Sequence, residues 1–156
     1  MKNMSDNVKP LGQDGAKRCF YLPTPPQLAD DWQLDTPDSL DKLVALNGNH
    51  WRKILVIMAK LSAPDEDWRG YMKRLLKADE QIHFGAARLS PHAKEHYVCG
   101  QQSAIKLGLT PLSEPKQFLQ HSEDEQQIFR LPYLDYRQCP NALIAALREQ
   151  RTSLAK

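Results

Sequence analysis

Paired cysteines and long apolar runs are both missing from this sequence. Its three cysteines, Cys19, Cys99 and Cys139, are odd in number and widely spaced, so there is no Cys-x-x-Cys pair of the kind found in zinc ribbons and thioredoxin-like proteins. The N-terminal residues lack the apolar stretch of a secretion signal, and the longest aliphatic run, residues 54–59, is far too short to span a bilayer. We therefore expect a cytoplasmic protein with reduced thiols and no membrane contact.

Glycine-rich and catalytic motifs are also absent. The seven glycines are scattered and form neither G-x-G-x-x-G, nor a phosphate loop, nor G-x-S-x-G. The zinc-protease motif H-E-x-x-H is missing as well, because the glutamate in residues 92–96 precedes the second histidine. Without a complete catalytic constellation, the sequence favours a non-enzymatic protein.

A strong excess of one charge is the third absence. Lysine and arginine number 21 against 19 acidic residues, which leaves a formal net charge of +2. A binding surface for nucleic acid must therefore be a local patch of basic residues rather than a property of the whole chain. The length of 156 residues and the ordinary share of hydrophobic residues, 41%, fit a single globular domain.

The periodicity of apolar residues predicts an all-α or mostly α protein. We expect a flexible N-terminal tail over residues 1–16 and a compact helical domain over residues 17–156, with five or six helices and one or two short extended segments. The predicted helices are 39–46, 49–61, 63–86, 91–107, 113–120 and 140–154, and the extended segments are 18–23 and 127–136. Residues 23–38, rich in proline and aspartate, are expected to form an acidic loop in which Trp32 and Leu34 pack inward.

A histidine–cysteine stretch is the first candidate site. On a helix, His92, His96 and Cys99 would share one face, and two histidines four residues apart are spaced to chelate zinc. A structural zinc site needs a fourth ligand, for which Cys139 and His83 are the candidates. The alternative is an ordinary helix without a metal or any other cofactor, in which Cys99 serves as a small apolar side chain.

A second candidate is a partial DNA-binding motif. Ala104, Leu107 and Gly108 resemble the middle of a helix-turn-helix, in which a small residue allows close approach and a glycine makes the turn. The following residues depart from that pattern, because Glu114 falls at an apolar position and Lys116 is the only cation of the second helix. The same residues also fit a helix that ends in a glycine cap.

The third candidate is a set of basic residues on the two strongest predicted helices, opposite their apolar faces. Its members are Arg52, Lys53, Lys60, Arg69, Lys73, Arg74 and Lys77. Side by side, these helices would present one positive surface for nucleic acid or for an acidic protein partner. The first hypothesis is therefore a regulator or accessory factor that binds nucleic acid, and the second is an adaptor or inhibitor of other proteins. The acidic loop could also cover the basic residues of a second copy in a homodimer.

Asp79 and His83 form the last candidate pair. They lie four residues apart on the apolar face of the helix predicted over 63–86, so their side chains would touch. Such a pair is either a buried ion pair or a general-base dyad.

Overall fold

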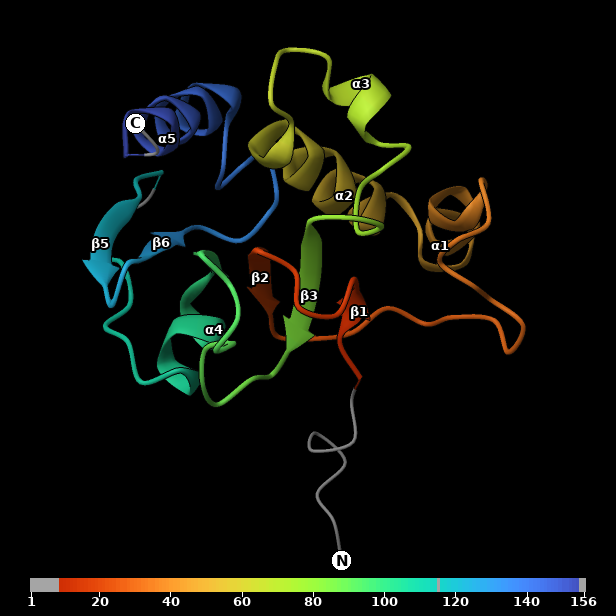
Figure 1. Ribbon diagram of the computed structural model, residues 1–156, viewed down its shortest axis with the longest axis horizontal. Helices are drawn as coiled ribbons and strands as arrows, with labels where there is room; N and C mark the ends of the chain where they lie inside the picture. Colours follow the sequence, from red (N-terminus) through yellow and green to blue (C-terminus); the bar gives the residue numbers. More distant parts are fainter. Residues whose placement is uncertain (1–8, 115, 155–156) are drawn as a thin grey trace, which may run out of the picture.

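The computed structural model describes residues 9–114 and 116–154, and of residues 152–154 the backbone alone. Its strands are β1 (Leu11–Gly12), β2 (Arg18–Leu22), β3 (Glu80–Phe84), β4 (Glu95–Cys99), β5 (Leu119–Glu123) and β6 (Gln126–Leu131). Its helices are α1 (Ser39–Asn47), α2 (Asn49–Ser62), α3 (Trp68–Tyr71), α4 (Gln101–Lys106) and α5 (Asn141–Leu154). This is an α/β fold (Figure 1), so the prediction of a mostly α protein is wrong.

The strands form one mixed sheet in the order β1-β3-β2-β4-β6-β5. The four central strands are parallel, and the two outer strands, β1 and β5, run antiparallel to their neighbours. Strand β2 lies in the middle, where Arg18 is in register with both Glu80 of β3 and Glu95 of β4. The amino ends of these three strands therefore meet at one edge of the sheet.

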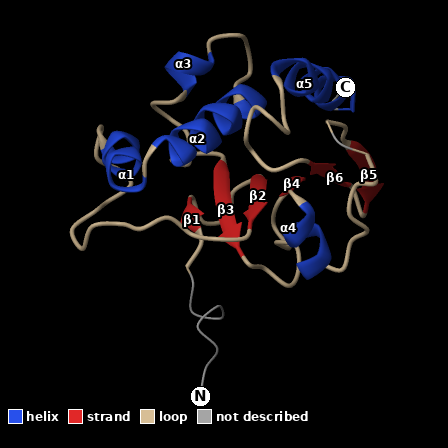
Figure 2. Cartoon of the chain, turned by 180° about the vertical axis from the view of Figure 1, so that it is seen from behind, coloured by secondary structure: helices blue, strands red, loops and turns tan. Residues whose placement is uncertain are grey.

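Helices cover both faces of the sheet, and successive strand residues point to opposite sides. Phe20 and Leu22 belong to the large core that α2 and α5 complete, whereas Cys19 and Tyr21 pack in a smaller core with Ala104 of α4. Figure 2 shows α4 apart from the other helices. Because both faces are covered, all five residues of β2 are buried, as is usual for strands of parallel sheets.

Several predicted elements are confirmed. Helices α1, α2 and α5 and strands β2 and β6 lie where the sequence places helices and extended segments. Trp32 and Leu34 pack against the core from the segment between β2 and α1, as expected. On α5, Leu143, Ile144 and Leu147 are buried, whereas the side chain of Leu154, predicted on the same face, lies outside the described residues.

The long helix predicted over 63–86 is not formed. Only α3 is helical there; Leu76 then takes a left-handed conformation with φ of 68°, and β3 follows. The apolar spacing of residues 68–76 is genuinely helical, but Ile82 and Phe84 alternate as strand residues facing the core. A short strand that is buried on both faces does not alternate between apolar and polar residues. Periodicity alone therefore does not distinguish it from a helix.

The helix predicted over 91–107 is likewise wrong, because residues 95–99 form β4 and only residues 101–106 form α4. Gly100, with φ of 90°, turns the chain from strand to helix. Between Gly108 and β5 the described residues form no helix, so the helix-turn-helix resemblance does not extend to the structure. The helix predicted over 113–120 is replaced by an irregular segment and by β5.

The acidic turn after β5 closes a hairpin. Asp124 and Glu125 both have positive φ, 51° and 67°, which is the conformation of a tight two-residue hairpin turn. This turn sets β5 against β6 with Glu123 opposite Gln126.

At the N-terminus, residues 1–8 of the predicted tail lie outside the described residues. Residues 11 and 12 form β1, and Leu11 and Ala16 are buried. A Cβ at Gly12 would lie 2.5 Å from the carbonyl oxygen of Glu80, so only glycine lets β1 approach β3 this closely. None of the helices in the described part of the chain is long and apolar enough to cross a membrane.

Candidate functional site

The predicted metal ligands are dispersed by the fold. His96 and Cys99 lie on β4 and face opposite sides of the sheet, because they are three residues apart on a strand. His92 is exposed in the preceding loop, and Cys139 is buried just before α5. Within residues 9–114 and 116–154, no group of three histidine, cysteine or acidic residues is placed to hold a metal ion.

His96 is instead the centre of a buried hydrogen-bond chain. Its Nε2 lies 3.0 Å from Oε1 of Gln126, and its Nδ1 lies 2.7 Å from the hydroxyl of Tyr21, which accepts the Ser90 N–H at 2.8 Å. The amide oxygen of Gln126 can only accept, so Nε2 carries the proton and Nδ1 accepts from Tyr21. Burial lowers the pKa of His96, which keeps the imidazole neutral.

The proposed pairing of Asp79 with His83 is not formed. Asp79 precedes β3 and lies 3.9 Å from Nζ of Lys17, whereas His83 stacks on Tyr21 with ring centroids 5.5 Å apart. Burial lowers the pKa of His83, and its buried Nε2 has no hydrogen-bond partner among the described residues. The two histidines thus bracket Tyr21 on the α4 side of the sheet.

Four of the seven predicted basic residues make contacts within the protein. Nζ of Lys60 donates to the Tyr136 hydroxyl and to Asn141, and lies 5.0 Å from the centroid of Trp68. Arg69 and Arg74 lie over aromatic rings of α3, and Lys77 donates to a backbone carbonyl. Lys60 and Lys77 thus connect separate parts of the fold, whereas Arg69 and Arg74 make contacts within the segment around α3.

The side chains of the other three, Arg52, Lys53 and Lys73, form no hydrogen bond or ion pair with any described residue. Arg52 and Lys73 are exposed, and Lys53 is partly exposed. Because residues 63–86 do not form one helix, the predicted row of charges at positions 69, 73 and 77 does not exist as a helix face.

A buried ionic cluster occupies the amino edge of the sheet. Arg18 donates from Nη1 to Glu80 at 2.8 Å and from Nε to Glu95 at 3.0 Å. Burial opposes the charged guanidinium, but the neighbouring carboxylates outweigh it and raise the pKa of Arg18. Arg18 in turn helps to lower the pKa of Glu95 against the opposing effect of burial. With its charges paired inside the protein, this cluster has a structural role.

The opposite, carboxyl edge of the sheet carries an open pocket. The chain leaves β2 toward β3 on one side and leaves β4 toward β6 on the other, so β2 and β4 flank the point where the strand order reverses. Ligands of open α/β sheets usually bind at the carboxyl ends of strands next to such a point. The pocket lies at the carboxyl ends of β4 and β6 and has a volume of about 290 Å³.

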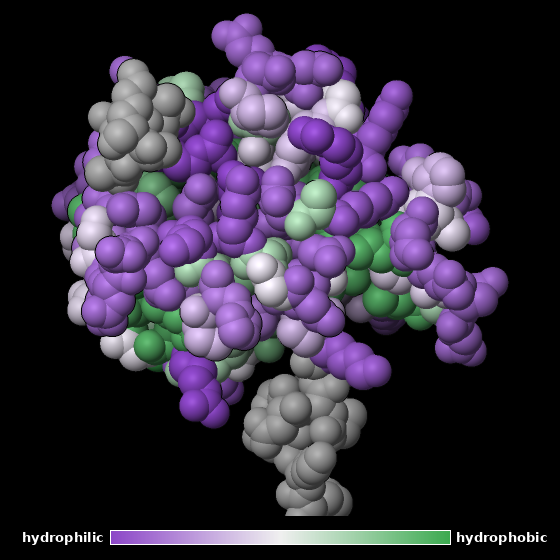
Figure 3. Space-filling model, in the orientation of Figure 1, coloured by the Kyte–Doolittle hydropathy of each residue, from purple (hydrophilic) through white to green (hydrophobic). Residues whose placement is uncertain are grey.

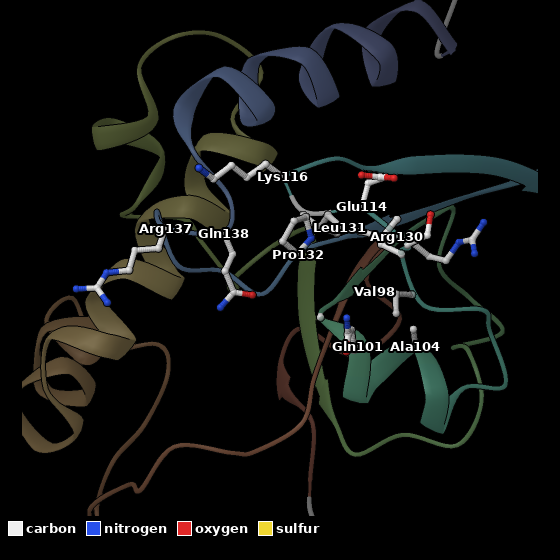
Figure 4. Close-up of a pocket in the computed structure, with 13 residues that line it drawn as sticks. Val98, Gln101, Ala104, Glu114, Lys116, Arg130, Leu131, Pro132, Arg137 and Gln138 are labelled. Carbon is white, nitrogen blue, oxygen red and sulfur yellow. The ribbon is translucent and has the colours of Figure 1, made fainter.

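Besides the ends of β4 and β6, three segments build this pocket: α4 with its preceding turn, the irregular residues 112–114 and 116, and the chain that follows β6. Its apolar side chains are Val98, Ala104, Leu112, Leu131 and Pro132, and its polar ones are Gln101, Ser113, Glu114, Lys116, Arg130, Arg137 and Gln138. Figure 4 shows the amides of Gln101 and Gln138 on different walls, with Arg130 and Arg137 on opposite sides. Three cations against one carboxylate make the surroundings of the pocket positive.

Arg130 has an unusual position in this pocket. Its Nη1 donates to the carbonyl of Thr110 at 2.6 Å, which holds the segment that leads to residues 112–114. Its Nε is buried and has no hydrogen-bond partner among the described residues. A buried donor of a charged group without an acceptor is costly, and such atoms often mark the place of a ligand or an ordered water.

A model of a family of unknown function, DUF6942, matches residues 9–152 of the chain. The chain belongs to this family. No curated protein and no solved structure matches it. The strands, the helices up to residue 152 and the carboxyl-edge pocket all lie within the matched part of this DUF6942 protein.

Sequence reasoning missed the pocket of this DUF6942 protein because its polar residues come from separate segments, none with a motif. One signal was available: Arg130 stands near the end of an apolar run that Pro132 terminates, as a polar residue at the carboxyl end of a buried strand. That signal becomes informative only when β4 is recognised as the parallel neighbour of β6.

Proposed function

We propose that this DUF6942 protein is a non-enzymatic binding protein for a small organic anion, held in the carboxyl-edge pocket. The ligand carries a carboxylate or phosphate group beside a compact apolar body. The observation that carries the proposal is the buried Nε of Arg130, which lacks an acceptor among the described residues. An anionic group of the ligand would pair with this guanidinium, because guanidinium groups bind carboxylates and phosphates well.

The surroundings of Arg130 support the same ligand. Lys116 and Arg137 are exposed at the pocket, and their charges favour the approach of an anion. Among the lining residues, Glu114 alone carries a charge that repels an anion. The apolar wall formed by Val98 and Leu131 suits an apolar body. The amides of Gln101 and Gln138 can orient it, because a few polar groups in a mostly apolar pocket are typical of small-molecule sites.

The test compares two probes, benzoate and inorganic phosphate, by calorimetry and by thermal unfolding. We expect saturable binding of at least one of them and a raised midpoint of unfolding. Arg130→Gln should weaken that binding about tenfold or more, because a charge-assisted hydrogen bond contributes roughly 1.5–3 kcal/mol. Arg88→Gln, at an exposed arginine outside the pocket, is the matched control and should bind like the unaltered protein.

Binding that survives Arg130→Gln unchanged, or that Arg88→Gln weakens equally, would contradict the proposal. Mass spectrometry of the purified protein under native conditions adds an independent readout. A small acid retained by the unaltered protein and lost from Arg130→Gln would support the assignment.

Nucleic-acid binding is a second candidate, and the free cations Arg52, Lys53 and Lys73 favour it. Cations without internal partners are available to neutralise phosphates, and such binding weakens steeply with salt. A mobility shift on random duplex at low salt, lost when all three residues are replaced by glutamate, is the expected result. If no shift occurs at low salt, an acidic protein partner remains the alternative for the same three residues.

We also place the protein in the cytoplasm as part of this proposal. All three cysteines are free and buried, which fits a reducing compartment. Fluorescence microscopy of a tagged chain in its own cells checks this placement.

A further inference from the structure

An apolar groove of about 360 Å³ lies between residues 27–36 and helix α1, away from the carboxyl-edge pocket. Two tethers hold the segment against the helix. The side chain of Asn47 donates to the Gln27 carbonyl at 2.7 Å and accepts the Gln27 N–H at 2.8 Å, and the Trp32 indole donates to the Ser39 carbonyl at 2.8 Å. The groove is therefore formed by fixed contacts within the chain.

The walls of the groove leave large apolar side chains in contact with solvent. Leu43 and Trp32 line it from the core side, while Leu28 is 40% exposed and Leu46 is 50% exposed. Among the described residues these are two of the four exposed large hydrophobic side chains, and they lie in one groove. Figure 3 shows apolar surface in the region of α1 and the segment before it, between hydrophilic projections. Apolar patches rimmed by polar residues often mark interaction sites.

The part of the chain that forms the groove is strongly acidic. Residues 23–47 contain five aspartates and a single basic residue, although the whole chain has a net charge of +2. The aspartates are all exposed, and they are Asp30, Asp31, Asp35, Asp38 and Asp41. The single basic residue, Lys42, lies 3.5 Å from Asp38, so its charge is already paired. The free charge around the apolar groove is thus negative.

We infer that this groove is a docking site for a basic amphipathic helix of a partner protein. Two apolar side chains one turn apart on that helix would contact Leu28 and Leu46, and lysines or arginines beside them would face the aspartates. Recognition through an apolar helix face is a recurrent mode of binding, and charge complementarity sets the partner and its orientation. An added strand is not favoured here, because α1 satisfies its backbone groups within the helix and offers no sheet edge.

The inference is independent of the proposed anion pocket, because it uses different residues and a ligand of opposite charge. Its probe is a labelled synthetic peptide of about 18 residues, long enough to form a helix, with leucines at i, i+4, i+7 and i+11 and lysines between them. One control peptide keeps the leucines and carries glutamates in place of the lysines. A second keeps the lysines and carries serines in place of the leucines.

We expect saturable one-to-one binding of the leucine–lysine peptide to the full chain by fluorescence anisotropy, with weaker binding at higher salt. Leu46→Ser should reduce the affinity about tenfold, since it removes most of an apolar contact. The triple change Asp30→Asn, Asp31→Asn and Asp35→Asn should reduce it by a similar factor and remove most of the salt dependence. The matched controls are Leu119→Ser, at a leucine that is 47% exposed on β5, and Glu123→Gln with Asp124→Asn and Glu125→Gln.

Equal binding of the glutamate or serine peptide would overturn the inference, as would affinity that the groove variants leave unchanged. Sedimentation of the protein alone tests whether the groove is instead occupied by a second copy of this chain. A concentration-dependent dimer that Leu46→Ser dissociates would assign the groove to self-association and overturn the partner helix.

Discussion

Arg18 and Glu80 begin two adjacent parallel strands and form a buried ion pair, with Nη1 and Oε2 2.8 Å apart. Both carboxylate oxygens of Glu80 are satisfied, because Oε2 also accepts the Tyr71 hydroxyl and Oε1 accepts the Leu76 N–H at 3.0 Å. Arg18 reaches a second carboxylate, that of Glu95, on the other side of β2. One guanidinium therefore connects the amino ends of three strands.

Replacing Arg18 by methionine should destabilise the protein by about 3–5 kcal/mol, because two buried carboxylates would lose their counter-charge. Glu80→Gln should cost less, since Glu95 still pairs with Arg18. Urea unfolding at pH 7.5 measures both effects. The control is Lys17→Met, one residue earlier, whose ion pair with Asp79 is exposed and should contribute less than about 1 kcal/mol. Similar stabilities for Arg18→Met and Lys17→Met would contradict a stabilising role of the cluster.

Stability should fall as the pH drops below about 6.5, the ordinary pKa of histidine. Burial lowers the pKa of His83 and of His96, so below that pH the unfolded chain binds more protons than the folded one. Each of the two histidines contributes at most about 1.4 kcal/mol per pH unit. Free energies of unfolding measured between pH 7.5 and 5.5 give this slope. Above the histidine pKa of the unfolded chain, these two residues should contribute no pH dependence.

His96→Gln should reduce that slope, and His92→Gln, at an exposed loop position, should leave it unchanged. A slope that persists fully in His96→Gln would assign the pH dependence to other groups. Below about pH 5 a separate loss is expected from Glu95, whose lowered pKa stabilises the folded state only while the carboxyl is ionised.

The three thiols should resist Ellman's reagent in the folded protein at pH 8. Burial raises the pKa of Cys19 and Cys99, and raises that of Cys139 to about 12, so the reactive thiolate is scarce and inaccessible. All three should react at once in concentrated guanidinium chloride. A cysteine that reacts within seconds in the native protein would show that its burial is transient.

Lys60→Met should destabilise the protein by about 1–3 kcal/mol. The ammonium lies between the rings of Trp68 and Tyr136, with Nζ 5.0 Å and 4.9 Å from their centroids, and it donates to two oxygens. The change removes both kinds of contact and keeps the apolar stem. Lys53→Met on the same helix, without such contacts, should change stability by less than about 0.5 kcal/mol. Equal effects of the two substitutions, measured by urea unfolding, would argue against the aromatic contacts.

Local signals in the sequence were sufficient for some elements. Helices α1 and α2 were predicted because their apolar residues follow the helical period and Gly48 separates them, and α5 because Pro140 precedes its apolar face. The same signals failed at β3 and β4, which are short, buried on both faces and paired with a strand far away in the sequence. Their neighbours, residues 68–76 and 101–106, do have helical spacing, and this extended the predicted helices across them.

The candidate sites, like the fold, were predicted from the sequence only in part. The sequence identified the residue types that carry charge and the acidic segment 23–38, which forms one wall of an exposed groove that Asp31 lines. It placed His92, His96 and Cys99 on one face, and that geometry failed because a strand alternates sides at every residue. Arg130 entered no sequence argument, because the pocket it lines joins segments about 30 residues apart.

The sequence by itself determined three amphipathic helices, an extended segment at residues 18–22 and a local excess of aspartate. These follow from composition and from contacts between near neighbours in the chain. The tertiary structure alone decided the parallel sheet, the pairing of Arg18 with Glu80 and Glu95, and the pocket at the carboxyl edge. Each of these depends on strands distant in sequence, whose hydrogen bonds and buried charges find their partners only when the sheet has formed.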